Sequence, residues 1–157
     1  MQESCREILL VEDNPADVRL IGYAFEESRA DCHLNVAHDG EEALDFVFRQ
    51  GTHIDAPRID LVLLDLNLPI MSGDSVLRAI RAHPDTRLLP VVILSSSGAR
   101  KDVLQAYESH ANGYIRKPRD LDGIFKAIAS LKNFWFEVAE LPSCIRQGQR
   151  VQRSEAV

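Results

Sequence analysis

The segment Ile59-Asp60-Leu61-Val62-Leu63-Leu64-Asp65 decides the fold class, because it is an almost continuous run of branched apolar residues that stops at a carboxylate. A strand with one face in water alternates apolar and polar residues, and this run is too continuous for that arrangement. It is typical of a strand covered on both faces, as in a parallel sheet with helices above and below. The segment therefore predicts an α/β fold in which Asp65 follows a buried strand.

Similar apolar runs lie on both sides of this segment, and two weaker candidates complete the set. The five expected strands are 8–11, 32–37, 59–64, 90–94 and 113–116. Apolar residues at helical spacing separate them. The expected helices run from Pro15 to about Ser28 behind an Asn14 cap, from a cap at Asp39, up to the residue before Pro84, around Val103 to Tyr107, and from Leu121 behind an Asp120 cap. This alternation predicts a doubly wound, five-stranded parallel sheet with helices on both faces.

Polar side chains follow the strands at the points where the strands end. They are Glu12, Asp13, Asp65, Asn67, Ser95 and Lys117. The carboxyl ends of parallel strands meet at one edge of a sheet, so we expect these side chains to converge. Three carboxylates there would repel one another unless a cation intervened, and Mg²⁺ prefers such oxygen ligands. A carboxylate, a metal, an ammonium group and a hydroxyl together favour phosphoryl transfer with an aspartate as nucleophile.

Length and charge limit the other function classes. The chain has 157 residues, which suits one domain, and 18 basic against 24 acidic side chains give a net charge of −6. Binding to nucleic acid through its phosphates needs clustered Lys and Arg, so we expect no nucleic-acid partner. The sequence contains neither a membrane-spanning apolar stretch nor the pattern of a signal peptide, so we expect a cytoplasmic protein without membrane contact.

Four motifs, in order and at strand ends, resemble bacterial response-regulator receiver domains over residues 6–131. They are Val11-Glu12-Asp13-Asn14, Leu64-Asp65-Leu66-Asn67-Leu68-Pro69-Ile70-Met71-Ser72-Gly73, Leu94-Ser95-Ser96 and Tyr114-Ile115-Arg116-Lys117-Pro118. The resemblance implies a CheY-like, flavodoxin-like sheet in the order 2-1-3-4-5. It also implies that a sensor histidine kinase transfers a phosphoryl group from a phosphohistidine to Asp65.

The resemblance further implies a metal site built around the phosphoacceptor. Asp13 and Asp65 would bind Mg²⁺ directly, Asn67 through its backbone carbonyl, and Glu12 largely through a metal-bound water. Lys117 would pair with the phosphoryl oxygens. These roles agree with the rule that cations and preorganised donors stabilise charge on a transferring phosphoryl group.

The same resemblance assigns a switch to the last two strands. Ser95 would donate its hydroxyl to the phosphoryl group, and Tyr114 would change rotamer as Ser95 moves. Lys117–Pro118 would be a cis peptide. Gly73 would give the loop after Asp65 a permissive backbone.

The residue two positions after Asp65, Asn67, distinguishes a phosphoacceptor switch from a hydrolytic enzyme. Hydrolases with an aspartyl nucleophile typically carry a second Asp two residues later as acid and base, and an Asn cannot take a proton from water there. We therefore expect a persistent phosphoryl group and slow self-dephosphorylation, not a turnover enzyme. The alternatives are an aspartyl-phosphate hydrolase, which Asn67 disfavours, and a constitutive interaction module, which the intact Asp13, Asp65 and Lys117 disfavour.

The C-terminal part extends the expected receiver. Residues 121–131 should pack on the sheet, whereas 132–141 carry three consecutive aromatic residues, Phe134, Trp135 and Phe136, for which we expect a homodimer or partner interface. Asn133-Phe134-Trp135 and Glu140-Leu141-Pro142 resemble the small single-domain response regulators of phytochrome-type histidine kinases, which implies a bacteriophytochrome partner. Residues 142–157 are expected to be disordered.

Overall fold

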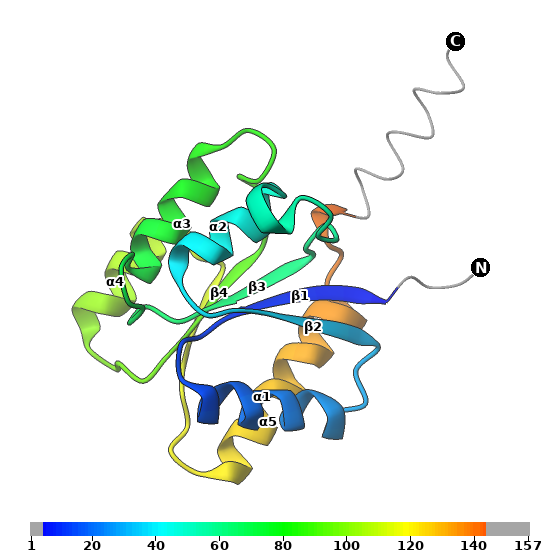
Figure 1. The fold of residues 1–157 in the computed structure, drawn as a ribbon. Coiled ribbons are helices and arrows are strands. Elements are labelled where there is room, and N and C mark those ends of the chain that lie inside the picture. Colours follow the sequence, from blue (N-terminus) through cyan, green and yellow to red (C-terminus); the bar gives the residue numbers. More distant parts are fainter. Residues whose placement is uncertain (1–4, 144–157) are drawn as a thin grey trace.

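Five parallel strands form one sheet in the order β2-β1-β3-β4-β5, which confirms the predicted topology (Figure 1). The computed structural model describes residues 5–143. The strands are β1 (Arg6–Val11), β2 (Cys32–Ala37), β3 (Leu61–Leu64), β4 (Val91–Ser95) and β5 (Gly113–Arg116). The helices are α1 (Pro15–Glu27), α2 (Gly40–Phe48), a 3-10 turn η1 (Gly51–His53), α3 (Gly73–Ala82), α4 (Arg100–Glu108), α5 (Leu121–Lys132) and a π-helical segment η2 (Asn133–Val138).

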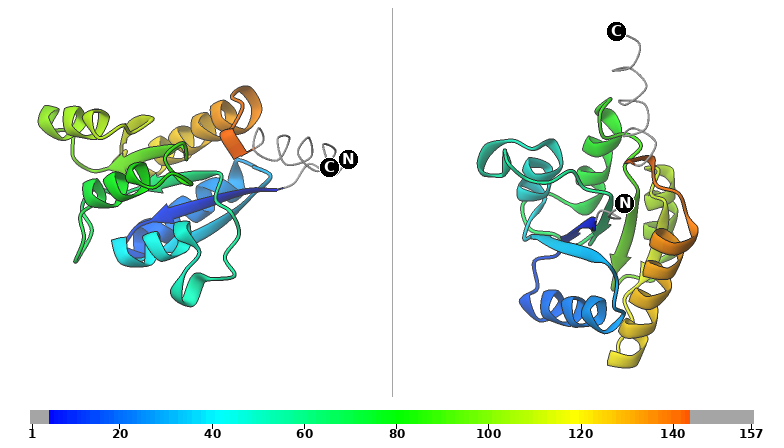
Figure 2. Two further views of the ribbon diagram at one scale, coloured as in Figure 1. Left: turned by 90° about the horizontal axis from the view of Figure 1, so that it is seen from above. Right: turned by 90° about the vertical axis from the view of Figure 1, so that its right-hand side faces the viewer.

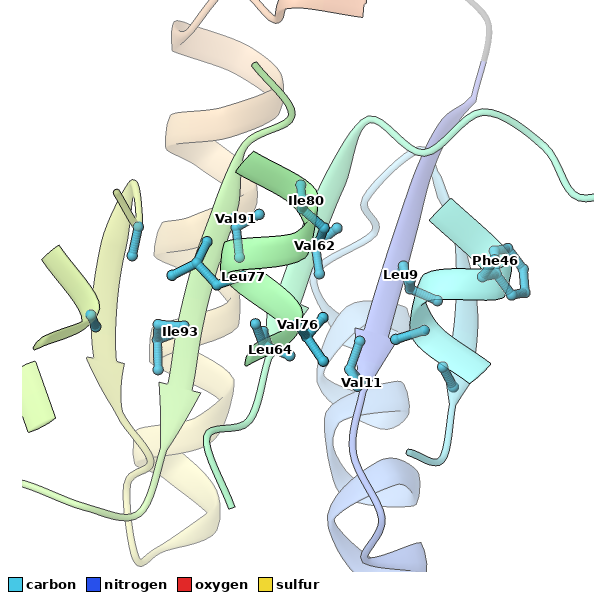
Figure 3. Close-up of a cluster of buried hydrophobic side chains, with 14 of the residues drawn as sticks. Leu9, Val11, Phe46, Val62, Leu64, Val76, Leu77, Ile80, Val91 and Ile93 are labelled. Atoms are coloured by element: carbon cyan, nitrogen blue, oxygen red, sulfur yellow. The ribbon is translucent and has the colours of Figure 1, made fainter. Parts of the chain in front are cut away.

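The apolar strands are buried on both faces, as the continuous runs predicted. Leu9 and Val11 of β1 belong to the core under α2, α3 and α4, whereas Ile8 and Leu10 belong to the core under α1 and α5. Figure 1 shows α1 and α5 on one side of the sheet and α2 and α3 on the other. The close-up in Figure 3 shows the first of these cores, where residues of β1, β3 and β4 meet α2 and α3.

The expected helix caps are confirmed. Asn14, Asp39 and Asp120 each accept hydrogen bonds from backbone N–H groups in the first turn of α1, α2 and α5. These caps start the helices directly after the strand-end residues. The third strand is shorter than predicted and begins at Leu61, and the Asp60 carboxylate just before it accepts a 2.8 Å hydrogen bond from the backbone N–H of Glu7.

The aromatic extension is part of the fold. Trp135 and Phe136 pack partly buried against the core under α1 and α5, and Leu141 is fully buried. Two of the three aromatic rings thus cover part of their own core, and the interface expected of this segment stays a prediction. Phe134 and Val138 are 51% and 67% exposed. Figure 2 shows the extension at the end of the molecule where β1 begins, away from the carboxyl ends of the strands.

Two expectations concern the ends of the chain and membranes. The expected disordered tail, residues 142–157, lies outside the described residues except for 142 and 143. Within residues 5–143, no helix combines the length and the apolar character that crossing a membrane requires.

Candidate functional site

Three carboxylates meet at the carboxyl ends of β1 and β3. Val11 pairs with Leu64 in the sheet, so the residues that follow, Glu12 and Asp65, come out side by side. One carboxylate oxygen each from Glu12, Asp13 and Asp65 lies within 4.8 Å of the other two. The strand register therefore brings together the carboxylates that the sequence placed at this edge.

Two of these acids are buried, so the stability of the site depends on a positively charged partner. Glu12 is 2% exposed and Asp65 is 6% exposed, whereas Asp13 is exposed. Lys117 extends from the end of β5, and its Nζ donates to Glu12 Oε2 at 2.5 Å and to Asp65 Oδ2 at 3.1 Å. Because an unpaired buried charge is costly, the ammonium group stabilises this arrangement of carboxylates.

A fourth carboxylate, which the sequence argument did not single out, also contacts Lys117. Asp17 Oδ2 in the first turn of α1 lies 3.2 Å from Lys117 Nζ. The pair is 100 residues apart in sequence, and only the tertiary fold brings the two side chains together. The position of Asp17 in the first turn of α1 gives no separate signal in the sequence, because acids are common near helix N-termini.

The electrostatics of the site follow from burial and crowding. The pKa of Glu12 is raised to about 7: burial is the main cause, the hydrogen bond from Lys117 opposes it, and the charge of Asp65 adds to it. Burial alone would lower the pKa of Lys117, but its contacts with Glu12 and Asp65 outweigh burial and raise it. Lys117 therefore stays protonated at neutral pH, whereas Glu12 is poised to exchange a proton for a cation.

The donor set fits a hard divalent cation. Glu12, Asp13 and Asp65 offer oxygen ligands within 4.8 Å of one another, and Asp13 keeps its side open to solvent. Mg²⁺ is usually held by few carboxylates while it keeps several waters, which such a half-open site permits. The backbone N–H of Asn67 donates to Asp65 Oδ1 at 3.1 Å, which fixes the chain two residues after Asp65.

Position 73 requires glycine, because the backbone of residues 65 and 66 passes close to it. A Cβ atom at this position would lie 2.2 Å from the carbonyl oxygen of Asp65 and 2.7 Å from Cα of Leu66. The backbone N–H of Gly73 also donates to the carbonyl of Leu66 at 3.0 Å. The expected permissive backbone is instead found at Ile70, whose φ of 69° lies in the left-handed region.

Ser95 and Tyr114 border the loop that follows β4. Ser95 is fully buried, and its Oγ accepts a 3.3 Å hydrogen bond from the backbone N–H of Ser97. The Tyr114 hydroxyl donates to the carbonyl of Ser97 at 2.7 Å, and Ser97 Oγ donates to Asp102 in α4 at 2.5 Å. The two expected switch residues are thus joined through Ser97.

The expected cis peptide is not observed. No peptide bond within residues 5–143 is cis, so Lys117–Pro118 is trans, the form that an X–Pro bond generally prefers. The trans chain still places Lys117 in the site. Its backbone N–H donates to the carbonyl of Ser95 at 2.7 Å, and its Nζ reaches the carboxylates.

Comparisons with known proteins agree with this geometry. Residues 8–129 match the family model described as the response regulator receiver domain. The chain is 42% identical to response regulator Rcp1 of Synechocystis sp. (strain ATCC 27184 / PCC 6803 / Kazusa), over 87% of this chain and 92% of that protein. A solved structure of Rcp1 in its Mn(2+)-bound form covers 87% of this chain and 99% of its own, with a TM-score of 0.82.

Two other solved structures are similar over most of their length. The phosphorylated cyanobacterial phytochrome response regulator RcpA is 39% identical, with a TM-score of 0.83 over 87% of this chain and 98% of its own. The bacteriophytochrome response regulator RtBRR is 35% identical, with a TM-score of 0.70 over 96% of this chain and 92% of its own.

Proposed function

The chain belongs to the response regulator receiver domain family, and from this premise we propose that Asp65 accepts a phosphoryl group from a sensor histidine kinase. The observation that carries the proposal is the environment of the Asp65 carboxylate. It is almost buried, lies 3.1 Å from an ammonium group, and shares a 4.8 Å cluster with Glu12 and Asp13. A carboxylate in such a site can attack phosphorus while cations balance the charge.

In the proposed reaction an Asp65 carboxylate oxygen attacks the phosphorus of a phosphohistidine. The new bond joins oxygen to phosphorus, the phosphorus–nitrogen bond breaks, and its electron pair returns to the imidazole. Mg²⁺ held by Glu12, Asp13, Asp65 and the backbone carbonyl of Asn67 would supply positive charge to the transferring oxygens. The Asn67 N–H keeps one Asp65 oxygen oriented, because it donates to Oδ1.

Lys117 and Ser95 then hold the transferred group. Lys117 Nζ already lies against Asp65 Oδ2, so it can donate to a phosphoryl oxygen on that side. The Ser95 hydroxyl would donate to another. Movement of Ser95 would disturb the Ser97 segment that Tyr114 and Asp102 hold, which supports a role for Tyr114 in the switch.

The family acts as a phosphoacceptor switch, and we extend this to slow self-dephosphorylation. The residue two positions after Asp65 is Asn67, whose amide cannot act as a general base. A phosphoryl group on Asp65 should therefore outlast a catalytic turnover. An aspartyl-phosphate hydrolase is disfavoured by the same residue, and a constitutive interaction module leaves the buried Glu12–Lys117–Asp65 contacts unexplained.

We infer the partners of this chain from the descriptions of similar proteins. RcpA and RtBRR are described as phytochrome and bacteriophytochrome response regulators, so we place a phytochrome-type histidine kinase upstream of this chain, in the cytoplasm.

We assign residues 6–131 to the receiver and 132–141 to an extension that packs on it. The exposed Phe134 and Val138 of η2 support a homodimer through this extension.

Phosphotransfer from a purified phytochrome-type kinase tests the proposal. A kinase labelled on its histidine should lose label to the wild-type chain within minutes in Mg²⁺ and not in EDTA. Asp65→Asn should accept none, while Asp60→Asn, which changes an acid at the other end of β3, should accept label as wild type does. Transfer to Asp65→Asn would contradict the assignment of the phosphoacceptor.

A further inference from the structure

Lys117 carries more carboxylate contacts than the proposed reaction uses. Its Nζ contacts Glu12, Asp65 and Asp17 at 2.5, 3.1 and 3.2 Å. An ammonium group has three N–H donors, so these three acceptors match its capacity. A phosphoryl oxygen can gain a hydrogen bond from Lys117 only by replacing or sharing one of them.

Asp17 is the partner most easily displaced. Its side chain is 33% exposed, against 2% for Glu12 and 8% for Asp65. It also stands outside the cluster of three carboxylates whose oxygens lie within 4.8 Å. Glu12 and Asp65 are held by burial and belong to the proposed metal site, whereas Asp17 can turn towards water at little cost.

The start of α1 presents Asp17 to Lys117. The side chain of Asn14 caps the helix by accepting from the backbone N–H groups of Ala16 and Asp17 at 2.9 and 3.4 Å. The backbone N–H of Asn14 in turn donates to Glu12 Oε1 at 3.2 Å. Glu12 therefore touches Lys117 with one oxygen and the Asn14 cap with the other, so the position of Asp17 is tied to the site.

We propose that Asp17 is a positioning residue that acts as an internal competing anion. It occupies one donor of Lys117 while Asp65 is unmodified, and an incoming phosphoryl group displaces it. This inference rests on the proposed function, because it concerns the anion that Asp65 receives. Its consequence is that Asp17 weakens binding of anions at the site while its charge assists binding of the cation.

A purely structural role for Asp17 predicts something different. An acid in the first turn of a helix stabilises that helix through the macrodipole, and an exposed ion pair adds little. Loss of such a role would lower the stability of α1 and disturb the whole site. The affinities for cation and anion would then both fall. Loss of a competing anion should instead raise the affinity for the anion and lower the affinity for the cation.

The test measures two affinities of the full chain by isothermal titration calorimetry. Mg²⁺ is titrated first, and beryllofluoride, which stands in for a phosphoryl group, is titrated at saturating Mg²⁺. For Asp17→Asn we expect beryllofluoride to bind about fivefold more tightly, the effect of one charge about 4 Å away in a water-like environment. Mg²⁺ should bind about twofold to fivefold more weakly, for the same reason.

Two further variants make the result specific. Asp17→Glu keeps the charge and should return both affinities towards the wild-type values. Glu41→Gln makes the same charge change at an exposed residue in the first turn of α2, and Glu41 is not among the three carboxylates that contact Lys117. It should change both affinities by less than about twofold, because solvent screens a charge that is not in contact with the site.

The outcomes separate the two proposals. Unchanged or weaker beryllofluoride binding by Asp17→Asn, with wild type binding normally, overturns the role of Asp17 and leaves the proposed function intact. Wild type that binds no beryllofluoride at saturating Mg²⁺ overturns the proposed function, and the role of Asp17 falls with it. Equal changes in Asp17→Asn and Glu41→Gln would mean a general charge effect and would also overturn the inference.

Discussion

Replacement of Lys117 by methionine should destabilise the metal-free protein and make its stability depend strongly on Mg²⁺. The substitution keeps an unbranched side chain of similar length and removes only the ammonium group. It leaves Glu12 and Asp65, which are 2% and 6% exposed, without the cation that contacts both. The crowded carboxylates then repel one another without compensation.

The size of the effect follows from the burial of these groups. Removing one member of a buried ion pair generally costs about 3–5 kcal/mol. Glu12 has a raised pKa of about 7 and can relieve part of the repulsion by taking up a proton, so we expect the lower end of that range, about 3 kcal/mol. For a chain of this size, that corresponds to a fall in melting temperature of about 6–12 °C.

Thermal unfolding followed by circular dichroism measures the effect, with each protein in EDTA and in excess Mg²⁺ near pH 7.5. The rise in melting temperature that Mg²⁺ causes should be larger for Lys117→Met than for wild type, because the metal no longer competes with the ammonium group. Lys101→Met, at an exposed position in α4, is the matched control and should change stability by less than about 0.5 kcal/mol. If Lys117→Met melted in EDTA at the wild-type temperature, or gained no more from Mg²⁺, this electrostatic reasoning would be refuted.

Three other predictions concern the same end of the sheet. The pKa of Glu12 is raised, mainly by burial, from 4.5 to about 7, so the contribution of this group to the stability of the metal-free protein is lost as pH rises through 7. Because a proton competes with the metal, Mg²⁺ affinity should fall up to about tenfold per pH unit below 7. Calorimetry should find this pH dependence of Mg²⁺ affinity reduced in Glu12→Gln. Ile70 is 81% exposed with φ 69°, and Ile70→Asn should stabilise the chain by about 1 kcal/mol in urea unfolding, whereas a loss of stability would mean that the loop relaxes elsewhere. Gly73→Ala places a Cβ 2.2 Å from the Asp65 carbonyl oxygen and should cost about 3 kcal/mol or more by the same measurement; a neutral result would exclude this close approach.

The topology and most of the site could be predicted because they depend on local pattern. Continuous apolar runs identified the buried strands, and the caps at Asn14, Asp39 and Asp120 identified where helices begin. Parallel strands carry their ends to one edge, so Asp65 and Lys117 could be expected to meet although 52 residues separate them.

The features that sequence reasoning missed depend on distances between elements. Asp17 meets Lys117 only in the folded chain, across 100 residues of sequence, and no spacing along the chain encodes that contact. Gly73 is required by the approach of a carbonyl oxygen that cannot be seen in the sequence. Trp135 and Phe136 are half-buried against the core under α1 and α5, a contact that the run of three aromatic residues did not indicate.

Identification of the modified residue after incubation with Mg²⁺ and acetyl phosphate tests the central claim most directly. Mass spectrometry of the intact chain, followed by peptide mapping, should find one phosphoryl group per chain on Asp65, persisting after the phosphodonor is removed. Asp65→Asn should stay unmodified. A chain that acquires no phosphoryl group, carries it on another residue, or consumes acetyl phosphate in rapid repeated turnovers would contradict the proposal that Asp65 is the phosphoacceptor of a switch.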